Sequence, residues 1–310
     1  MISVIVIGRN EGERLGACLE SIRTAMHVLS HEVIYVDSGS SDDSLALAKA
    51  AGARCFLLSE PSPTAGLGRL VGTKEAKGEF LLFLDGDMQL RPGFAEKALM
   101  TFASRDCDGV TGVREDVYMQ GGREIGRNPN YFGCTAERVC PEFGGAVFLK
   151  AEALAKCGGW SGDTIACEEA ELHARLLDAG CTIVEIPVPM ILHTDAVREN
   201  RGVLSVFFSR RRLGEGQAMR CAMAKGKAAA YMRREKEKFL FYALDWLCLL
   251  LLLLFGGLGF AAACGIQAMQ LGFLIARRRP RAFVSCKLFF FAFPAGLATW
   301  RARSMDYAAV

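Results

Sequence analysis

The first hundred residues alternate between short apolar runs and segments in which apolar residues recur at helical spacing. Between the runs, residues spaced by three or four predict helices from Leu15 to Leu29, over Ser44–Ala51 and over Arg69–Lys77. Uninterrupted apolar strands that alternate with helices are typical of a parallel sheet covered on both faces, so the pattern predicts an α/β fold. The predicted strands are Ser3–Gly8, Val33–Asp37, Arg54–Leu58 and Phe80–Leu84.

The following hundred residues give a weaker pattern. Residues 115–145 are rich in Gly, Arg, Asn and Pro and predict no defined element. A helix is predicted over Ala166–Ala179 and a further strand over Thr182–Pro187. No internal repeat interrupts the chain, so residues 1–200 are expected to form one globular domain.

The C-terminal third is dominated by an apolar segment. Residues 239–276 contain one charged side chain, Asp245, and a single helix of this length would measure about 57 Å. The hydrocarbon core of a bilayer is about 30 Å thick, so two shorter helices that turn at Gly256-Gly257-Leu258-Gly259 fit better. The segment therefore predicts a transmembrane hairpin, whose basic flanks at Lys236, Lys238 and Arg277–Arg281 favour the cytoplasmic side.

The last apolar stretch, Ala282–Trp300, contains Lys287 and Pro294 and ends in a basic tail. We expect an interfacial or re-entrant element there, with a third span as the alternative. The basic loop, this segment and the tail make up residues 277–310.

Charge divides the chain in the same way. A hydrophobic content of 51% with 23% charged residues excludes a disordered chain, and the formal net charge of +3 is the sum of −10 over residues 1–200 and +13 over residues 201–310. Residues 201–238 hold 11 basic and 3 acidic side chains immediately before the apolar segment. They show no nucleic-acid motif, so they predict a juxtamembrane region that contacts anionic lipids, and no nucleic-acid partner.

The cysteines and the N-terminus indicate the compartment. The twelve cysteines form no C-x-x-C pair and no cluster with histidine, which favours reduced thiols in the cytosol. The run from Met1 to Ile7 lacks a basic flank and a cleavage pattern, so it is not read as a signal peptide. The globular domain is therefore expected on the cytoplasmic face of the inner, or plasma, membrane.

Polar clusters follow three of the predicted strands. Asn10-Glu11 comes after the first strand, Asp37-Ser38-Gly39-Ser40 after the second and Asp85-Gly86-Asp87 after the fourth. Each cluster alone is ordinary, because an aspartate after a strand commonly caps a turn. The carboxyl ends of parallel strands meet at one crevice, so together the clusters predict a ligand site there.

These segments resemble the signature of family 2 glycosyltransferases, which have the GT-A fold, a Rossmann-like, mostly parallel sheet with helices on both faces. The resemblance implies a membrane-anchored bacterial-type enzyme of glycan or exopolysaccharide assembly. It places Asn10, Glu11 and Asp37 at the nucleotide sugar, with Asp37 facing the base, and Asp85 at the ribose or the metal. Asp87 would bind Mg²⁺ or Mn²⁺, a hard cation that prefers carboxylate oxygens and bridges the diphosphate.

Further matches are less specific. Arg69 stands where the family often has Ala-Arg-Asn, and the resemblance implies a diphosphate contact, the alternative being a solvated arginine in the first turn of a helix. Gly144 and Gly145 resemble the glycine pair beside the sugar, the alternative being a tight turn. His193 would complete the metal shell or contact phosphate, whereas a lone histidine at a strand end is commonly structural.

The segment Cys167-Glu168-Glu169-Ala170-Glu171 resembles the acidic helix start of the family, whose second acid is the catalytic base of inverting enzymes. That position is Glu169, and a carboxylate opposite the leaving group suits attack by a hydroxyl. The alternative is that all three acids complement the helix N-terminus.

We therefore expect an inverting, metal-dependent glycosyltransferase that moves a sugar from a nucleoside-diphosphate sugar to a lipid-linked glycan at the membrane. One alternative is a polyprenyl-phosphate monosaccharide synthase, in which residues 201–238 bind the lipid phosphate. Another is a non-catalytic membrane assembly subunit with a transferase fold. The sugar, the base, the acceptor and any homo-oligomer stay open.

Overall fold

The structure, a computed structural model, describes residues 1–196, 209–277 and 281–310. Unit 1 contains residues 1–164, 168–196 and 301–310, whereas unit 2 contains residues 165–167, 209–277 and 281–300. Parts of the predicted juxtamembrane region, 201–208, and of the basic loop, 278–280, lie outside the described residues.

The first four strands of unit 1 form the parallel half of its sheet. They are ordered β3-β2-β1-β4, and the register pairs Gly8 of β1 with Asp37 of β2 and Ile7 of β1 with Asp85 of β4. The carboxyl ends of these strands therefore meet, as the alternating pattern predicts. The strands are β1 (Ile2–Gly8), β2 (His31–Asp37), β3 (Arg54–Leu58) and β4 (Phe80–Asp85).

The second half of the sheet is mixed. Beyond β4 the order continues β9-β6-β10-β5, with β9 antiparallel to both of its neighbours and β6 parallel to β10. β7 pairs with β6, and β8 pairs with β10. The bounds are β5 (Met88–Leu90), β6 (Gly109–Gln120), β7 (Arg123–Asn128), β8 (Arg138–Val139), β9 (Val147–Lys150) and β10 (Ile183–Ala196).

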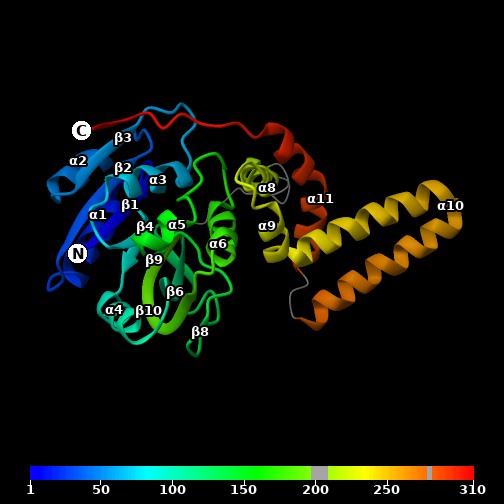
Figure 1. Cartoon of the computed structure of the whole chain (residues 1–310), viewed down its shortest axis with the longest axis horizontal. Helices are drawn as coiled ribbons and strands as arrows, with labels where there is room; N and C mark the ends of the chain where they lie inside the picture. Colours follow the sequence, from blue (N-terminus) through cyan, green and yellow to red (C-terminus); the bar gives the residue numbers. More distant parts are fainter. Residues whose placement is uncertain (197–208, 278–280) are drawn as a thin grey trace. The chain divides into compact units, whose positions relative to one another are not determined.

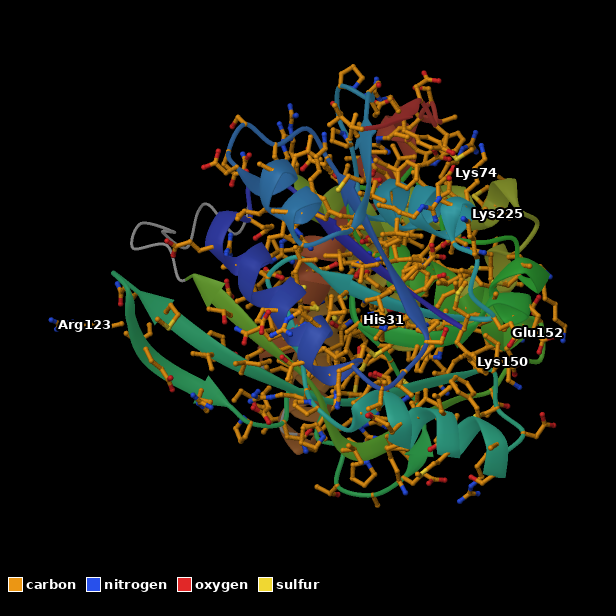
Figure 2. All side chains as sticks on the ribbon, turned by 90° about the vertical axis from the view of Figure 1, so that its left-hand side faces the viewer. His31, Lys74, Arg123, Lys150, Glu152 and Lys225 are labelled. Atoms are coloured by element: carbon orange, nitrogen blue, oxygen red, sulfur yellow. The ribbon has the colours of Figure 1, made fainter. Side chains whose placement is uncertain are left out.

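The sequence predicted no element in residues 115–145, and the structure places the β6–β7 ribbon there. Its turn is Gly121-Gly122, with φ of 55° and 78°, which suits a two-residue hairpin turn that needs positive φ at both positions. Arg123 marks this end of the ribbon, which extends to the outer edge of unit 1 (Figure 2). Its side chains are polar on much of both faces, so no apolar alternation indicated a strand.

A last strand comes from the C-terminus. β11 (Tyr307–Ala309) pairs antiparallel with β3, and Tyr307 packs edge-on against Phe56, with ring centroids 5.9 Å apart. From the sequence, only a basic tail is expected after residue 300. The strand has three residues and no apolar run, so it has no signature of its own.

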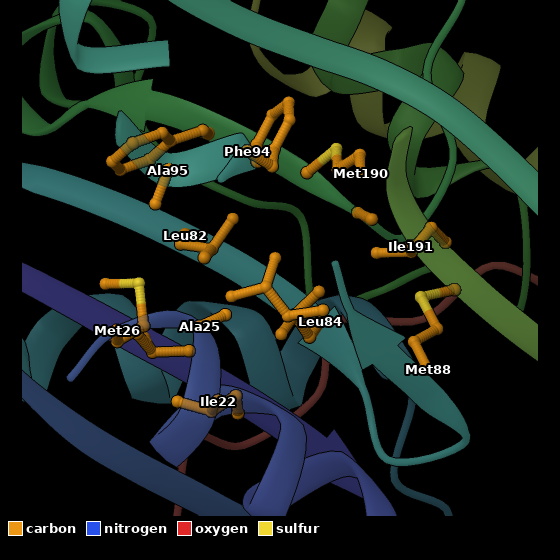
Figure 3. Packing of buried hydrophobic residues seen from close by; sticks show 14 of the residues in the cluster. Ile22, Ala25, Met26, Leu82, Leu84, Met88, Phe94, Ala95, Met190 and Ile191 are labelled. Atoms are coloured by element: carbon orange, nitrogen blue, oxygen red, sulfur yellow. The ribbon is translucent and has the colours of Figure 1, made fainter. Parts of the chain in front are cut away.

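The two faces of the sheet carry separate hydrophobic layers. Val4 and Val6 of β1 point into one layer and Ile5 and Ile7 into the other, because successive strand residues face opposite sides. Figure 3 shows the first layer, where Phe94 lies beside Met190. Its helices are α1 (Gly12–Ala25), α2 (Ser44–Ala50) and α4 (Phe94–Ser104), and those of the other layer are α3 (Ala65–Glu75), α5 (Ala151–Lys156) and α6 (Glu168–Asp178).

Helix α3 begins earlier than predicted and lies close to the sheet. The Thr64 hydroxyl accepts a hydrogen bond from the Leu67 amide at 3.1 Å and so caps the helix. A Cβ on Gly72 would stand 2.3 Å from the side chain of Ile5, so glycine is needed for this close approach. The close packing holds Arg69 above the carboxyl ends of the strands.

Unit 2 is helical. Its long element α10 consists of two helices that meet at Gly256, where φ is 53° and ψ is −122°, and these two legs run antiparallel (Figure 1). By length and composition alone, this element is long and apolar enough to cross a membrane. The elements are η1 (Arg210–Leu213), α8 (Gly214–Ala224), α9 (Ala228–Arg234), α10 (Lys236–Ala276) and α11 (Arg281–Thr299).

Candidate active site

The loops after β1 and β2 are joined to each other. Asn10 has a φ of 57°, and its side-chain oxygen accepts a hydrogen bond from the Ser41 amide at 2.8 Å. The Asn10 amide donates in turn to the hydroxyl of Ser40 at 2.9 Å. Asparagine tolerates this left-handed conformation better than most residues. The two predicted nucleotide loops are therefore held as one surface.

Asp37 organises the second loop. Its carboxylate is buried and accepts hydrogen bonds from the Gly39 amide at 3.1 Å, the Ser40 amide at 2.8 Å and the Tyr35 hydroxyl at 3.0 Å. The hydroxyl of Ser40 also donates to it. These donors belong to the same strand and loop, so the carboxylate shapes the turn in which it lies.

Glu11 lies between two glycines that follow β1 and β4. A Cβ on Gly8 or Gly86 would stand 3.1 or 3.0 Å from the Glu11 side chain, so the glycines make room for it. Glu11 pairs with Arg14 at 2.8 Å. Burial and the negative charge of Asp87 raise the pKa of Glu11, which shows that acidic groups are crowded at this edge.

Arg69 lies at the centre of a buried charge cluster. Its guanidinium has an exposed fraction of 1% and lies 2.7 Å from Asp85, 2.9 Å from Glu168 and 3.7 Å from Glu169. The guanidinium carbon also lies 4.9 Å from the centre of the Trp160 ring. These contacts bring together α3, β4 and the first turn of α6, so Arg69 is not a solvated arginine.

Gly145 provides the space for this cluster. A Cβ at Gly145 would stand 2.3 Å from a carboxylate oxygen of Asp85 and 2.7 Å from Arg69. At Gly144 the nearest atom would be the guanidinium of Arg114, at 3.5 Å. Only Gly145 therefore needs to be glycine for a close approach, and the groups that it approaches are the side chains of Asp85 and Arg69.

The three acids at the start of α6 have different surroundings. Glu171 is fully buried and makes two hydrogen bonds to Arg175, of 2.7 and 2.6 Å, and Glu168 is buried against Arg69. The Glu169 side chain keeps an exposed fraction of 24%. Burial and the adjacent charge of Glu168 raise the pKa of Glu169 to about 7, although Arg69 acts in the opposite direction.

A second polar group lies around His193 of β10. Its Nε2 atom is 3.4 Å from Asp87, and its Nδ1 atom is 3.1 Å from the buried Asp116 and 3.0 Å from Arg114. Arg114 also donates to Asp116 at 2.7 Å. Burial alone would lower the pKa of His193, but its hydrogen bond to Asp87 raises it overall.

Asp87 and His193 could hold a metal ion together. One oxygen of Asp87 is buried without a hydrogen-bond partner, as expected of an oxygen that binds a cation, and the other faces the imidazole. A histidine ligand commonly has a carboxylate on its other nitrogen, which is the place of Asp116. Among the described residues no three acidic, histidine or cysteine side chains form a closed metal site, so an ion here would need further ligands.

The structure thus brings the predicted residues into two groups at one edge of the sheet. Arg69, Asp85 and Glu169 belong to the first, and Asp87 and His193 to the second. Gly145 touches the first group, and Gly144 faces Arg114 of the second across a recess that Phe132 also lines. Arg114, Asp116 and Trp160 were not predicted from the sequence, because they lie in segments without a clear apolar pattern. The polar triplet Arg114-Glu115-Asp116 was the available signal.

Comparison with known proteins identifies the family. Residues 3–161 match the model of glycosyl transferase family 2, which is about half of the chain. The chain belongs to this family. It is 24% identical over 191 residues to glycosyltransferase AglE of Haloferax volcanii, which is 59% of this chain and 63% of AglE. It is 34% identical over 116 residues to glucosyl-3-phosphoglycerate synthase of Mycolicibacterium smegmatis, 35% of this chain and 38% of that one. The chain thus matches less than two thirds of either relative.

Solved structures show the same GT-A fold as this family 2 member. TarS of S. aureus in complex with UDP-GlcNAc has a TM-score of 0.60 at 16% identity, over 96% of this chain and 90% of that chain. The mannosyltransferase PcManGT of Pyrobaculum calidifontis in complex with GDP-Man and Mn²⁺ has a TM-score of 0.60 at 17% identity, over 96% and 87%. The predicted fold is confirmed.

Replacing Arg69 by methionine should destabilise the family 2 domain. Three carboxylates would lose their counter-charge in a buried place, which typically costs about 3–5 kcal/mol. The free energy of unfolding should fall more at pH 8 than at pH 5.5, because at the lower pH protonation removes part of the uncompensated negative charge. Urea unfolding at both pH values measures it. Arg127→Met, which removes an exposed pair with Glu124, is the control and should cost less than about 1 kcal/mol. Equal losses for the two variants would contradict the central role of Arg69.

The glycine pair gives a second test. Gly145→Ala should lower the free energy of unfolding by about 1–3 kcal/mol, because the methyl group overlaps Asp85 and Arg69. Gly144→Ala meets no atom closer than 3.5 Å and should stay within about 0.5 kcal/mol of the wild type. Chemical denaturation of both variants decides, and a costlier Gly144→Ala would contradict the structure.

Proposed function

We propose that the protein is an inverting, metal-dependent glycosyltransferase that moves a sugar from a nucleoside-diphosphate sugar to a hydroxyl of a lipid-linked glycan at the cytoplasmic face of the plasma membrane. The observation that carries the proposal is the pair of groups at one sheet edge: a carboxylate tuned for proton transfer, Glu169, and a metal-type pair, Asp87 and His193. Two proteins with the same fold are seen in complex with nucleotide sugars, TarS with UDP-GlcNAc and PcManGT with GDP-Man.

Glu169 is the proposed catalytic base. A base works best when its pKa lies near the working pH, and the pKa of Glu169 is raised to about 7. Of the three acids in its helical turn, Glu169 keeps the largest exposed fraction, 24%, and it lies 3.7 Å from Arg69, whereas Glu168 and Glu171 make closer ion pairs. A phosphate acceptor already carries its negative charge, so a tuned base favours a hydroxyl acceptor over the polyprenyl-phosphate alternative.

Asp87 and His193 are the proposed protein ligands of Mg²⁺ or Mn²⁺, with Asp85 beside them. The ion supplies charge stabilisation for the departing nucleoside diphosphate. Asp116 holds the imidazole from its other side. Burial acts to raise the pKa of Asp87, but the hydrogen bond from His193 outweighs burial and lowers the pKa, which keeps this carboxylate ionised. PcManGT with Mn²⁺ supports a divalent cation.

Arg69 is proposed as a positioning residue. Two of its nitrogens bind Asp85 and Glu168, so its guanidinium aligns the donor-side and base-side carboxylates. This role differs from the direct diphosphate contact that the resemblance implies, which stays a prediction. Asn10, Glu11 and Asp37 form the proposed nucleotide surface after β1 and β2.

The long apolar helix supports the membrane part of the proposal. α10 exposes large apolar side chains over most of its length, and a soluble acceptor gives no reason for such a surface. Basic side chains at α9 and at the start of α10 suit anionic lipids. A glycan carried by a lipid would meet the enzyme at this surface.

Glu169→Gln tests the base. The variant keeps the shape but not the basicity, so turnover should fall by about 10²–10⁴ while donor affinity changes little. In the wild type kcat/KM should fall as the pH drops below about 7, because Glu169 is then protonated, and the variant should lose this dependence. Stopped assays with radiolabelled donor measure both.

Glu152→Gln is the matched control, since Glu152 also stands in the first turn of a helix, α5, but is exposed. It should retain wild-type turnover and pH dependence. Near-normal turnover of Glu169→Gln would reject the hydroxyl-acceptor mechanism in favour of the polyprenyl-phosphate synthase. Absence of transfer to any lipid by the wild type would favour the non-catalytic assembly subunit.

Asp87→Asn tests the metal. Loss of a carboxylate ligand should weaken Mn²⁺ binding about 10–100-fold or more, measured from free Mn²⁺ by electron paramagnetic resonance. Asp43→Asn, on an exposed side chain at the start of α2, should bind as the wild type does. Full transfer activity in EDTA would contradict metal dependence.

A further inference from the structure

The hairpin of α10 has an attached end and a free end. At its attached end it contacts the rest of unit 2: Lys238 pairs with Glu215 of α8 at 2.5 Å, Phe239 packs edge-on against Phe293 of α11, and Trp246 packs on Phe290. Toward the turn, every side chain from Leu252 to Leu258 is exposed. Figure 1 shows the two legs running away from α8, α9 and α11.

A polar cluster marks the boundary between these two ends. Asp245 accepts a hydrogen bond from Gln267 of the returning leg at 2.9 Å and pairs with Lys287 of α11. Lys287 also donates to Gln270 at 2.5 Å. Asp245 and Gln270 are buried by these contacts. Beyond the cluster, residues 246–266 contain no charged or amide side chain.

The free part is half as long as a bilayer core. Ten residues from Trp246 to Phe255 rise about 15 Å, and the hydrocarbon core is about 30 Å thick, so one leaflet accounts for about 15 Å. If the turn reached the far surface, the attached end would have to sink by the same distance. Three ion pairs, Asp245–Lys287, Glu215–Lys238 and Glu237–Arg277, would then enter hydrocarbon or approach it, which is costly for charged groups.

We infer that α10 inserts residues 246–266 into a single leaflet of an anionic lipid bilayer, with its turn near the midplane, while α11 lies at the surface and does not cross. The inference rests on the membrane part of the proposed function and specifies its geometry. It replaces the transmembrane hairpin expected for residues 239–276 with an anchor that enters and leaves on one side.

The C-terminal strand supports this arrangement independently. β11 is part of the sheet of unit 1, and Arg301 pairs with Glu60 of the same unit at 3.2 Å. Both connections of unit 2 therefore lead to unit 1, which can lie on only one side of a membrane. The number of crossings between them is even, so α11 cannot be a third span.

The attached end of the hairpin also carries the positive charges that suit anionic lipid headgroups. Lys225, Arg233, Lys236 and Arg277 are exposed around α9 and the base of the hairpin, which suits an anionic headgroup layer. At the turn only Gly256 leaves helical geometry, which limits the backbone groups without a helical partner in lipid. Gly259 approaches the carbonyl of Leu251 so closely that a Cβ would stand 1.9 Å from it, and this holds the legs together.

Depth-dependent fluorescence quenching tests the inference on the full chain. The protein is reconstituted in vesicles of phosphatidylethanolamine and phosphatidylglycerol, with a fluorophore on Leu258→Cys or Leu250→Cys in a Cys264→Ser background. Nitroxides are placed near the headgroup or near the end of the acyl chain. The same background without the introduced cysteine corrects for labelling of other cysteines, and Arg277→Cys is the shallow reference.

In a single-leaflet anchor the probe at Leu258 is the deeper one, and the deep nitroxide should quench it at least about two-fold more than the shallow one. A spanning hairpin reverses the order, because Leu250 then lies near the midplane and Leu258 near the far headgroups, and that result overturns the inference while membrane binding stands. Failure to float with vesicles overturns both the inference and the membrane part of the proposed function, and leaves the Glu169 tests unaffected. Phe260→Cys, also exposed, replaces Leu258→Cys if that variant does not fold.

Discussion

Arg69 holds a positive charge where almost no water reaches it, and three carboxylates from two other segments of the chain balance that charge. Removing a guanidinium from water is costly, so its folded position is stable only when the end of β4 and the first turn of α6 arrive together. Trp160 covers its face, and the absence of a side chain on Gly145 leaves room for the contact with Asp85. The arrangement of Asp85 and the first turn of α6 follows from this neutralisation.

The same charge balance gives Glu169 its chemical character. Asp85 and Glu168 take the short contacts with Arg69, and Glu169 is left at 3.7 Å with a like charge beside it. Carboxylates of one chemical type thus acquire different roles from their surroundings, one structural and one suited to proton transfer. At the other group the roles divide likewise, since Asp116 holds His193 and Asp87 keeps an unpaired oxygen.

Local pattern predicted the parallel half of the sheet because its strands are buried on both faces and therefore contain uninterrupted apolar runs. It also placed Asp37, Asp85 and Asp87 at one edge, since strand ends meet wherever a parallel sheet forms. It could not predict contacts set by tertiary packing. Arg69 and Glu168 are 99 residues apart, and the β6–β7 ribbon that carries Asp116 is polar on much of both faces. The pairing of β11 with β3 depends on a partner strand rather than on its own three residues.

After unit 2 the chain returns to the sheet of unit 1 through β11. Unit 2 is an insertion whose two ends join strands of unit 1, β10 before it and β11 after it, so both of its connections are fixed on one side of any membrane. A helical anchor tied at one end only could add a span of either direction. An anchor tied at both ends would have to enter and leave a membrane on the side of unit 1. The three-residue strand β11 therefore constrains the topology of the whole anchor, although it buries little surface itself.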